Sequence, residues 1–146
     1  MLNLHRLGNA KSIFAYTCRH RVAHQLAIPG GERFFHIAVA LGENFKAQEA
    51  DLVGKFETLA GLSGYFHCAE KKGYAGVGIY TRFEPSHVIQ GFDGGEFDAE
   101  GRYLELRFDT PKRKLSLISS YFPSGASGPE RQEAKFRFLD LIYPHL

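Results

Sequence analysis

The sequence predicts a mixed α/β fold, in which short strands form a sheet and a C-terminal helix packs on it. From Gly64 onward, short apolar runs alternate with turn residues, which is typical of strands in a sheet. Residues 128–146 instead repeat apolar side chains at the spacing of an α-helix. We therefore expect the helix to cover one sheet face, and no segment of the sequence is an evident cover for the other.

The first third of the chain predicts fewer elements. Residues 1–33 match none, because apolar residues are scattered and Pro29-Gly30-Gly31 interrupts the chain. Phe34–Leu41 is a continuous apolar run with one histidine, which predicts a buried strand. Residues 48–62 mix acidic and apolar side chains at a loose helical spacing, which predicts a helix.

The rest of the chain predicts strands that end in a hairpin. Three short apolar runs predict strands at 64–69, 77–82 and 88–92. Arg102–Phe108 alternates between apolar and polar residues, which indicates a half-buried strand with Tyr103, Glu105 and Arg107 on its polar face. The turn Pro111-Lys112-Arg113 leads into the next strand, Lys114–Tyr121, as its antiparallel neighbour.

The final helix begins at Gly128-Pro129, since proline suits the first helical position. Its expected inner face carries Phe138, Leu141, Ile142 and His145. Glu133 and Arg137 stand four residues apart, which predicts an ion pair on the exposed side.

Composition indicates one soluble domain. The chain has 146 residues, of which 44% are hydrophobic and 23% charged, and no apolar run is long enough to cross a membrane. Its two cysteines, Cys18 and Cys68, form no metal motif or disulfide framework, so a reducing cytoplasm is expected. A net charge of +2 does not by itself argue for nucleic-acid binding. The charge is uneven, because residues 1–42 hold five basic residues and one acid.

Five stretches in series carry a family resemblance. They are Lys46–Leu52, His67–Tyr80, Glu96–Arg102, Tyr121–Gly125 and the helical segment Glu130–Phe138. On these residues the chain from Lys46 onward closely resembles the exonuclease III family of DNA-repair nucleases, which includes the apurinic endonucleases. One short match would be weak support, but five in order are specific.

The resemblance implies a partial four-layer αββα sandwich of the DNase I-like type, with mixed, mainly antiparallel sheets. It implies hydrolysis of DNA phosphodiesters with Mg²⁺ or Mn²⁺, both as a 3′-to-5′ exonuclease and beside abasic sites. The partner would be double-stranded DNA with abasic sites or 3′ ends. A carboxylate-bound metal would offset phosphate charge in such a reaction.

The resemblance also assigns individual residues. Tyr121, where a strand gives way to a loop, would hydrogen-bond the scissile phosphate through a phenol that is neutral at pH 7; the alternative is a core tyrosine with a satisfied hydroxyl. Lys72, Gly73 and Tyr74 look like the loop that grips the DNA backbone, and the alternative is a solvated turn. Arg102 looks like a phosphate-contacting arginine, and the alternative is an exposed charge at a strand start.

The chain also departs from the family pattern. The family's Asn-x-Asn-Gly strand and its final Asp-His pair have no counterpart. Glu43 is the candidate metal ligand, although it stands one residue away from the family spacing, and such a slip turns a strand side chain to the other face. We therefore divide the chain into an atypical segment, 1–45, and the N-terminal part of a nuclease domain, 46–146. Segment 1–45 is interpreted as out-of-frame translation, a targeting peptide or a divergent domain start.

Three functional hypotheses remain open from the sequence. The first is an active metal-dependent nuclease. The second is a catalytically dead remnant that binds DNA through Lys72, Tyr74 and Arg102. The third is a non-functional fragment that self-associates through an uncovered apolar sheet face. Whether the chain is an enzyme is undecided by these patterns alone.

Overall fold

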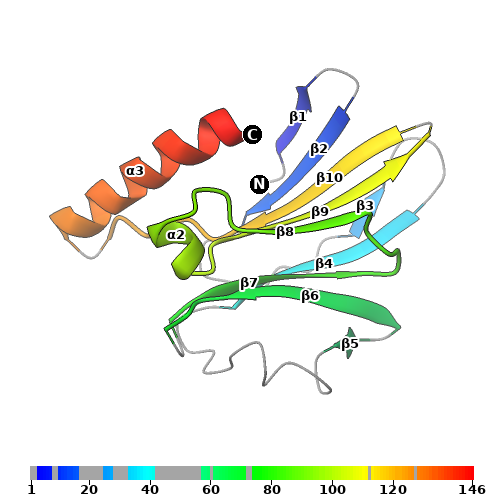
Figure 1. Cartoon of the computed structure of the whole chain (residues 1–146), viewed down its shortest axis with the longest axis horizontal. Coiled ribbons are helices and arrows are strands. Elements are labelled where there is room, and N and C mark those ends of the chain that lie inside the picture. Colours follow the sequence, from blue (N-terminus) through cyan, green and yellow to red (C-terminus); the bar gives the residue numbers. More distant parts are fainter. Residues whose placement is uncertain are drawn as a thin grey trace.

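The computed structural model contains two five-stranded sheets that pack face to face, with a long helix along one of them (Figure 1). The backbone is described for 3–7, 10–16, 25–27, 33–41, 57–59, 61–71, 74–111, 113–126 and 128–146. Side chains are described for 57–58, 61–71, 74–111, 114–126 and 128–146.

The first sheet contains the predicted hairpin. Its strands, in spatial order, are β1 (Asn3–Leu7), β2 (Ala10–Tyr16), β10 (Arg113–Ser120), β9 (Tyr103–Thr110) and β8 (His87–Gln90). Only the β2–β10 pair is parallel among these neighbours. The predicted antiparallel hairpin is confirmed, since β9 and β10 pair with Leu106 opposite Leu117.

The second sheet is antiparallel throughout. Its strands, in spatial order, are β3 (Gln25–Ala27), β4 (Arg33–Leu41), β7 (Gly76–Thr81), β6 (Leu62–Cys68) and β5 (Thr58–Leu59). The strands predicted at 34–41, 64–69 and 77–82 are therefore confirmed with small shifts of their ends.

Two expectations for the first half of the chain are wrong. Residues 1–33, which matched no element, contribute β1, β2 and β3. The helix predicted over 48–62 does not reach its expected end, because β5 and β6 pair there as a tight hairpin with Gly61 at φ 78°. The part of that prediction at 48–56 lies outside the described residues.

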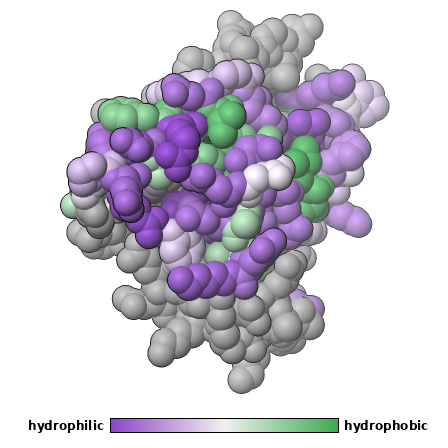
Figure 2. All heavy atoms as spheres, turned by 60° about the vertical axis from the view of Figure 1, so that its left-hand side comes forward, coloured by the Kyte–Doolittle hydropathy of each residue, from purple (hydrophilic) through white to green (hydrophobic). Residues whose placement is uncertain are grey.

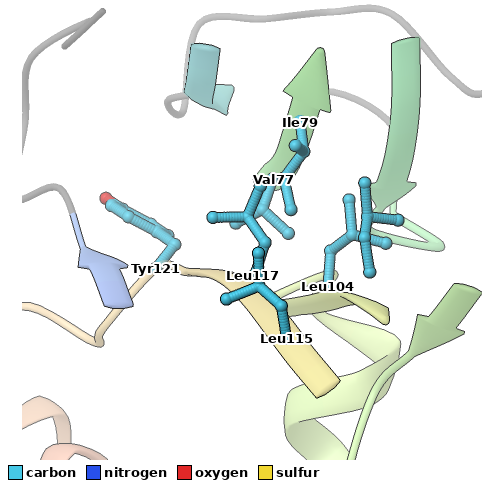
Figure 3. Close-up of a cluster of buried hydrophobic side chains, with 7 residues drawn as sticks. Val77, Ile79, Leu104, Leu115, Leu117 and Tyr121 are labelled. Atoms are coloured by element: carbon cyan, nitrogen blue, oxygen red, sulfur yellow. The ribbon is translucent and has the colours of Figure 1, made fainter. Parts of the chain in front are cut away.

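The main core lies between the two sheets (Figure 3). It joins Val77 and Ile79 of β7 to aliphatic side chains of β9 and β10, which are Leu104, Leu106, Leu115 and Leu117. Each such burial contributes about 1.5–3 kcal/mol. The second sheet thus covers the face that the sequence left without a cover, and that expectation is wrong.

A second core lies between the first sheet and the helices α2 (Glu96–Ala99) and α3 (Pro129–His145). Phe138 and Ile142 are buried there as expected, with Phe97 edge-to-face on Phe138 at 5.0 Å between ring centroids. Leu141 is 47% exposed, so its expected burial is wrong.

The expected ion pair within α3 is also wrong. Arg137 reaches across to Glu96 of α2, with an Nη2–Oε1 distance of 2.9 Å, instead of pairing with Glu133. Because α2 packs directly beside α3, an inter-helical carboxylate is available to Arg137, and the pair connects the two helices.

The structure is therefore α/β with mostly antiparallel sheets, and the described residues form three layers: helices, first sheet and second sheet. No helix in the described part of the chain is long and apolar enough to span a membrane.

The polar face of β9 holds a buried carboxylate. Glu105 is only 4% exposed and Tyr103 is fully buried, so β9 is buried on both faces over its first four residues, while Arg107 further along the polar face is exposed. Glu105 accepts hydrogen bonds from Arg107 Nε (2.7 Å), Ser116 Oγ (2.8 Å) and the Tyr103 hydroxyl (2.9 Å). Burial acts to raise the pKa of Glu105, but these hydrogen bonds outweigh it and lower the pKa below its ordinary value.

We expect Glu105→Gln to destabilise the fold by about 1–3 kcal/mol at pH 7, because charged hydrogen bonds are lost in a buried site. Since folding lowers the pKa of Glu105, its contribution is full above the unfolded value near 4.5 and is lost as pH falls through the folded value. Urea unfolding of both proteins at pH 7 and below pH 4 measures this. A free-energy gap that widens on acidification contradicts it.

The turn after α2 packs closely on the end of β6. Gly101 has φ 63°, and a Cβ placed on it would lie 2.5 Å from Ala69 N and Cys68 C. The neighbouring Glu70 N–H donates to Ala99 O at 2.9 Å. Since both neighbours of that Cβ are backbone atoms, no side-chain movement can make room for a larger residue.

We expect Gly101→Ala to destabilise the protein more than Gly94→Ala. Both glycines have positive φ, but nothing lies within 4 Å of a Cβ at Gly94. Each variant incurs about 1–2 kcal/mol of backbone strain, and Gly101→Ala adds about 1–3 kcal/mol of overpacking. Denaturant midpoints measure the difference, and equal midpoints would show that the close approach has no energetic weight.

Candidate functional site

Tyr121 lies directly after β10, at the edge of the core between the sheets. It is 8% exposed, and its backbone N–H donates to Arg102 O at 2.9 Å. Figure 3 shows its ring beside the aliphatic side chains, with the hydroxyl at the end of the ring farthest from them. The tyrosine is thus a core residue by its ring, while its hydroxyl points away from that core.

Arg102 is buried between α2 and β9, with 3% of its surface exposed. Its Nη1 donates to Tyr121 O at 3.0 Å, its Cζ lies 5.1 Å from the centroid of the Tyr121 ring, and its Nε pairs with Glu100 Oε2. The alternative of an exposed strand-start charge is therefore wrong. A buried guanidinium needs such partners, because an uncompensated buried charge costs several kcal/mol.

Tyr74 lies close to two cationic side chains. Its hydroxyl donates to Glu100 Oε1 and accepts from Arg131 Nη1, each at 2.7 Å. Lys71 Nζ and Arg131 Cζ lie 5.8 Å and 5.7 Å from the ring centroid. The β6–β7 loop, which carries Tyr74, is thereby joined to the first turn of α3.

Glu100 connects these groups, because one of its oxygens pairs with Arg102 and the other accepts from Tyr74. Three of the predicted residues, Tyr74, Arg102 and Tyr121, are therefore brought together at one end of the sandwich. Glu100 and Arg131 were not among the residues predicted from the sequence. The stretch Glu100-Gly101-Arg102 was part of the family resemblance, but the ion pair between Glu100 and Arg102 depends on the tight turn at Gly101.

Comparison with curated proteins gives several partial matches, while no protein-family model matches the chain. A Bacillus subtilis exodeoxyribonuclease is 29% identical over 82 residues, covering 56% of this chain and 31% of that protein. Haemophilus influenzae exodeoxyribonuclease III is 30% identical over 97 residues, covering 66% and 36%. A Dictyostelium discoideum DNA-(apurinic or apyrimidinic site) endonuclease is 26% identical over 84 residues, covering 57% and 22%.

The chain is similar to exodeoxyribonucleases and apurinic endonucleases. The match spans about a third of the length of the two exodeoxyribonucleases. The names of these relatives agree with the resemblance drawn from the sequence, and they link the chain to nucleases that act on DNA.

Three predicted residues of this nuclease-like chain, Glu43, Lys72 and Gly73, lie outside the described residues. Among the side chains that the structure does describe, no three histidine, cysteine, aspartate or glutamate residues are grouped to hold a metal ion. Near Tyr121, both oxygens of Glu100 are engaged by Arg102 and Tyr74. The described donor set therefore does not fit a magnesium site, and the metal-ligand prediction stays with Glu43.

Proposed function

We propose that this chain is a metal-dependent DNA-repair nuclease of the exonuclease III type. Its substrates would be phosphodiesters at abasic sites and 3′ ends of double-stranded DNA. The proposal is carried by the convergence of Tyr74, Arg102 and Tyr121, which the resemblance marks independently and which lie far apart in the sequence. The proposal includes a DNase I-like αββα sandwich, a nuclease part at 46–146 after an atypical segment at 1–45, and a cytoplasmic location.

The chemistry of the cluster suits a phosphodiester. The Tyr121 hydroxyl is a neutral donor for a phosphate oxygen. Arg102 holds the Tyr121 backbone by a hydrogen bond to its carbonyl oxygen. Lys71 and Arg131 place positive charge within 6 Å of the centre of the Tyr74 ring. The end of the sandwich that carries the start of α3 is turned forward in Figure 2, and the described residues that are coloured there are predominantly hydrophilic. Such a surface is compatible with a charged polymer as partner.

Mg²⁺ or Mn²⁺ would supply charge neutralisation and an activated water when bound. Glu43 is the residue that we assign to it. What the described residues would do is bind and orient the substrate: Tyr121 through its hydroxyl, Tyr74 through its ring, and Arg102 through the contact that holds Tyr121 in place.

A second function, DNA binding without cleavage, is favoured by one observation. The described residues include aromatic and cationic groups suited to a DNA backbone, but no group of metal ligands. This alternative predicts salt-sensitive binding to duplex DNA and no strand cleavage with excess metal.

We expect the chain to nick a duplex with one abasic site in the presence of Mg²⁺, and Tyr121→Phe to slow nicking about 100-fold through loss of a transition-state hydrogen bond. Tyr143→Phe is the matched control, because Tyr143 is 70% exposed on α3. Gel analysis of end-labelled DNA measures both rates. Absence of nicking by the unmodified chain contradicts the nuclease function, and full activity of Tyr121→Phe contradicts the tyrosine's role.

We expect Lys72→Ala to reduce the slope of log affinity against log salt concentration by about 1, because one phosphate contact is lost. Lys114→Ala is the control. Lys114 is exposed at the far end of β10 from Tyr121, about 20 Å away at the strand rise per residue. Fluorescence anisotropy with a catalytically inactive variant measures both slopes. Equal slopes for the two variants would remove Lys72 from the interface.

A further inference from the structure

Glu100 contacts two of the candidate site residues, Tyr74 and Arg102. Its Oε1 accepts from the Tyr74 hydroxyl at 2.7 Å, and its Oε2 pairs with Arg102 Nε. Through Arg102 Nη1 the chain of contacts continues to Tyr121 O at 3.0 Å. One carboxylate thus links the loop after β6 to the residue that follows β10.

We propose that Glu100 is a positioning residue that couples DNA contact at Tyr74 to the placement of Tyr121. This inference rests on the proposed function, because it assigns a task within the same site. Glu100 itself does not touch the substrate. It orients Tyr74 directly and Tyr121 through Arg102, and these two tyrosines are the groups that contact the substrate.

The electrostatics of the site argue for this role. A carboxylate at a surface that binds phosphate repels the ligand, so an acid there weakens DNA binding unless it organises other groups. Both oxygens of Glu100 are occupied by groups that belong to the interface. The carboxylate therefore orders a cation and an aromatic side chain whose positions depend on it.

The same contacts extend to α3. The Tyr74 hydroxyl donates a hydrogen bond to Glu100 and accepts one from Arg131 of α3. The ring is consequently fixed by its oxygen and lies close to the guanidinium of Arg131. A phosphate drawn to Lys71 or Arg131 would meet a Tyr74 side chain that is held by two hydrogen bonds.

The test compares Glu100→Gln with Glu96→Gln. Glu96 lies four residues earlier at the start of α2, is half exposed, and pairs with the exposed Arg137. Both changes remove one negative charge, so both should tighten non-specific DNA binding by a similar factor. Only Glu100→Gln should also lower kcat at saturating abasic-site duplex, by about 10- to 100-fold, since small misplacements of catalytic groups have effects of this size.

The readouts separate positioning from a purely structural role. A structural role changes the denaturant midpoint but leaves kcat of the folded fraction at saturation unchanged. Tighter binding by Glu100→Gln with unchanged kcat shows a bystander acid and overturns the proposal. A fall in kcat for Glu100→Gln but not for Glu96→Gln supports it.

Hydrogen exchange tests the role of Glu100 independently of DNA cleavage. The Tyr74 amide donates to Lys71 O at 3.2 Å within the loop that Glu100 anchors. Hydrogen exchange at this amide should quicken about tenfold or more in Glu100→Gln and stay unchanged in Glu96→Gln. Unchanged exchange in Glu100→Gln overturns the proposal. Faster exchange in a chain that cuts no DNA supports the anchoring step while the nuclease function fails.

Discussion

The close approach of Gly101 to the backbone at the end of β6 determines how the two sheets meet at the end that carries the candidate site. Backbone packs against backbone there, and the hydrogen bond from Glu70 N–H to Ala99 O continues the contact. Glu100 and Arg102 flank this glycine, so a turn with little freedom sets their directions. Their contacts with Tyr74 and Tyr121 follow from that turn.

Burial of Arg102 makes the site depend on the fold. A guanidinium that is 3% exposed needs a carboxylate and acceptors around it, and Glu100 and the Tyr121 carbonyl supply them. Buried ion pairs add little net stability, because desolvation offsets most of the attraction. The pair is therefore better explained by the orientation it imposes on Tyr121 than by a contribution to folding. On the same sheet, the Glu105 carboxylate likewise holds three donors in fixed directions.

The fold was predictable where local pattern decides the structure, and less so where tertiary contacts do. The β9–β10 hairpin and α3 follow from alternation, turn residues and helical spacing. Alternation on β9 marked which face is polar, but it carries no signal that this face is also buried. Arg137 shows the same limit, because its choice between Glu133 and Glu96 depends on how α2 lies beside α3.

The residues of the candidate site also fall into those that the sequence pattern predicts and those that only tertiary contacts reveal. Tyr74, Arg102 and Tyr121 were predictable because each stands in a stretch that resembles the nuclease family. Glu100 and Arg131 were not, since their contacts with Tyr74 span 26 and 57 positions and exist only once the loop, the turn and α3 are assembled.

Because the overall charge of the chain is low, the positions of the cations near Tyr74 are important. A formal charge of +2 gives the whole chain only a modest attraction for DNA, so in the proposed function the affinity would come from a few cations held near the phosphates. Around Tyr74 two such cations lie within 6 Å of one ring, and an acid that opposes DNA binding is kept among them. In the proposed function, an interface built in this way would give up some attraction for a defined geometry, which is the balance that selective recognition requires.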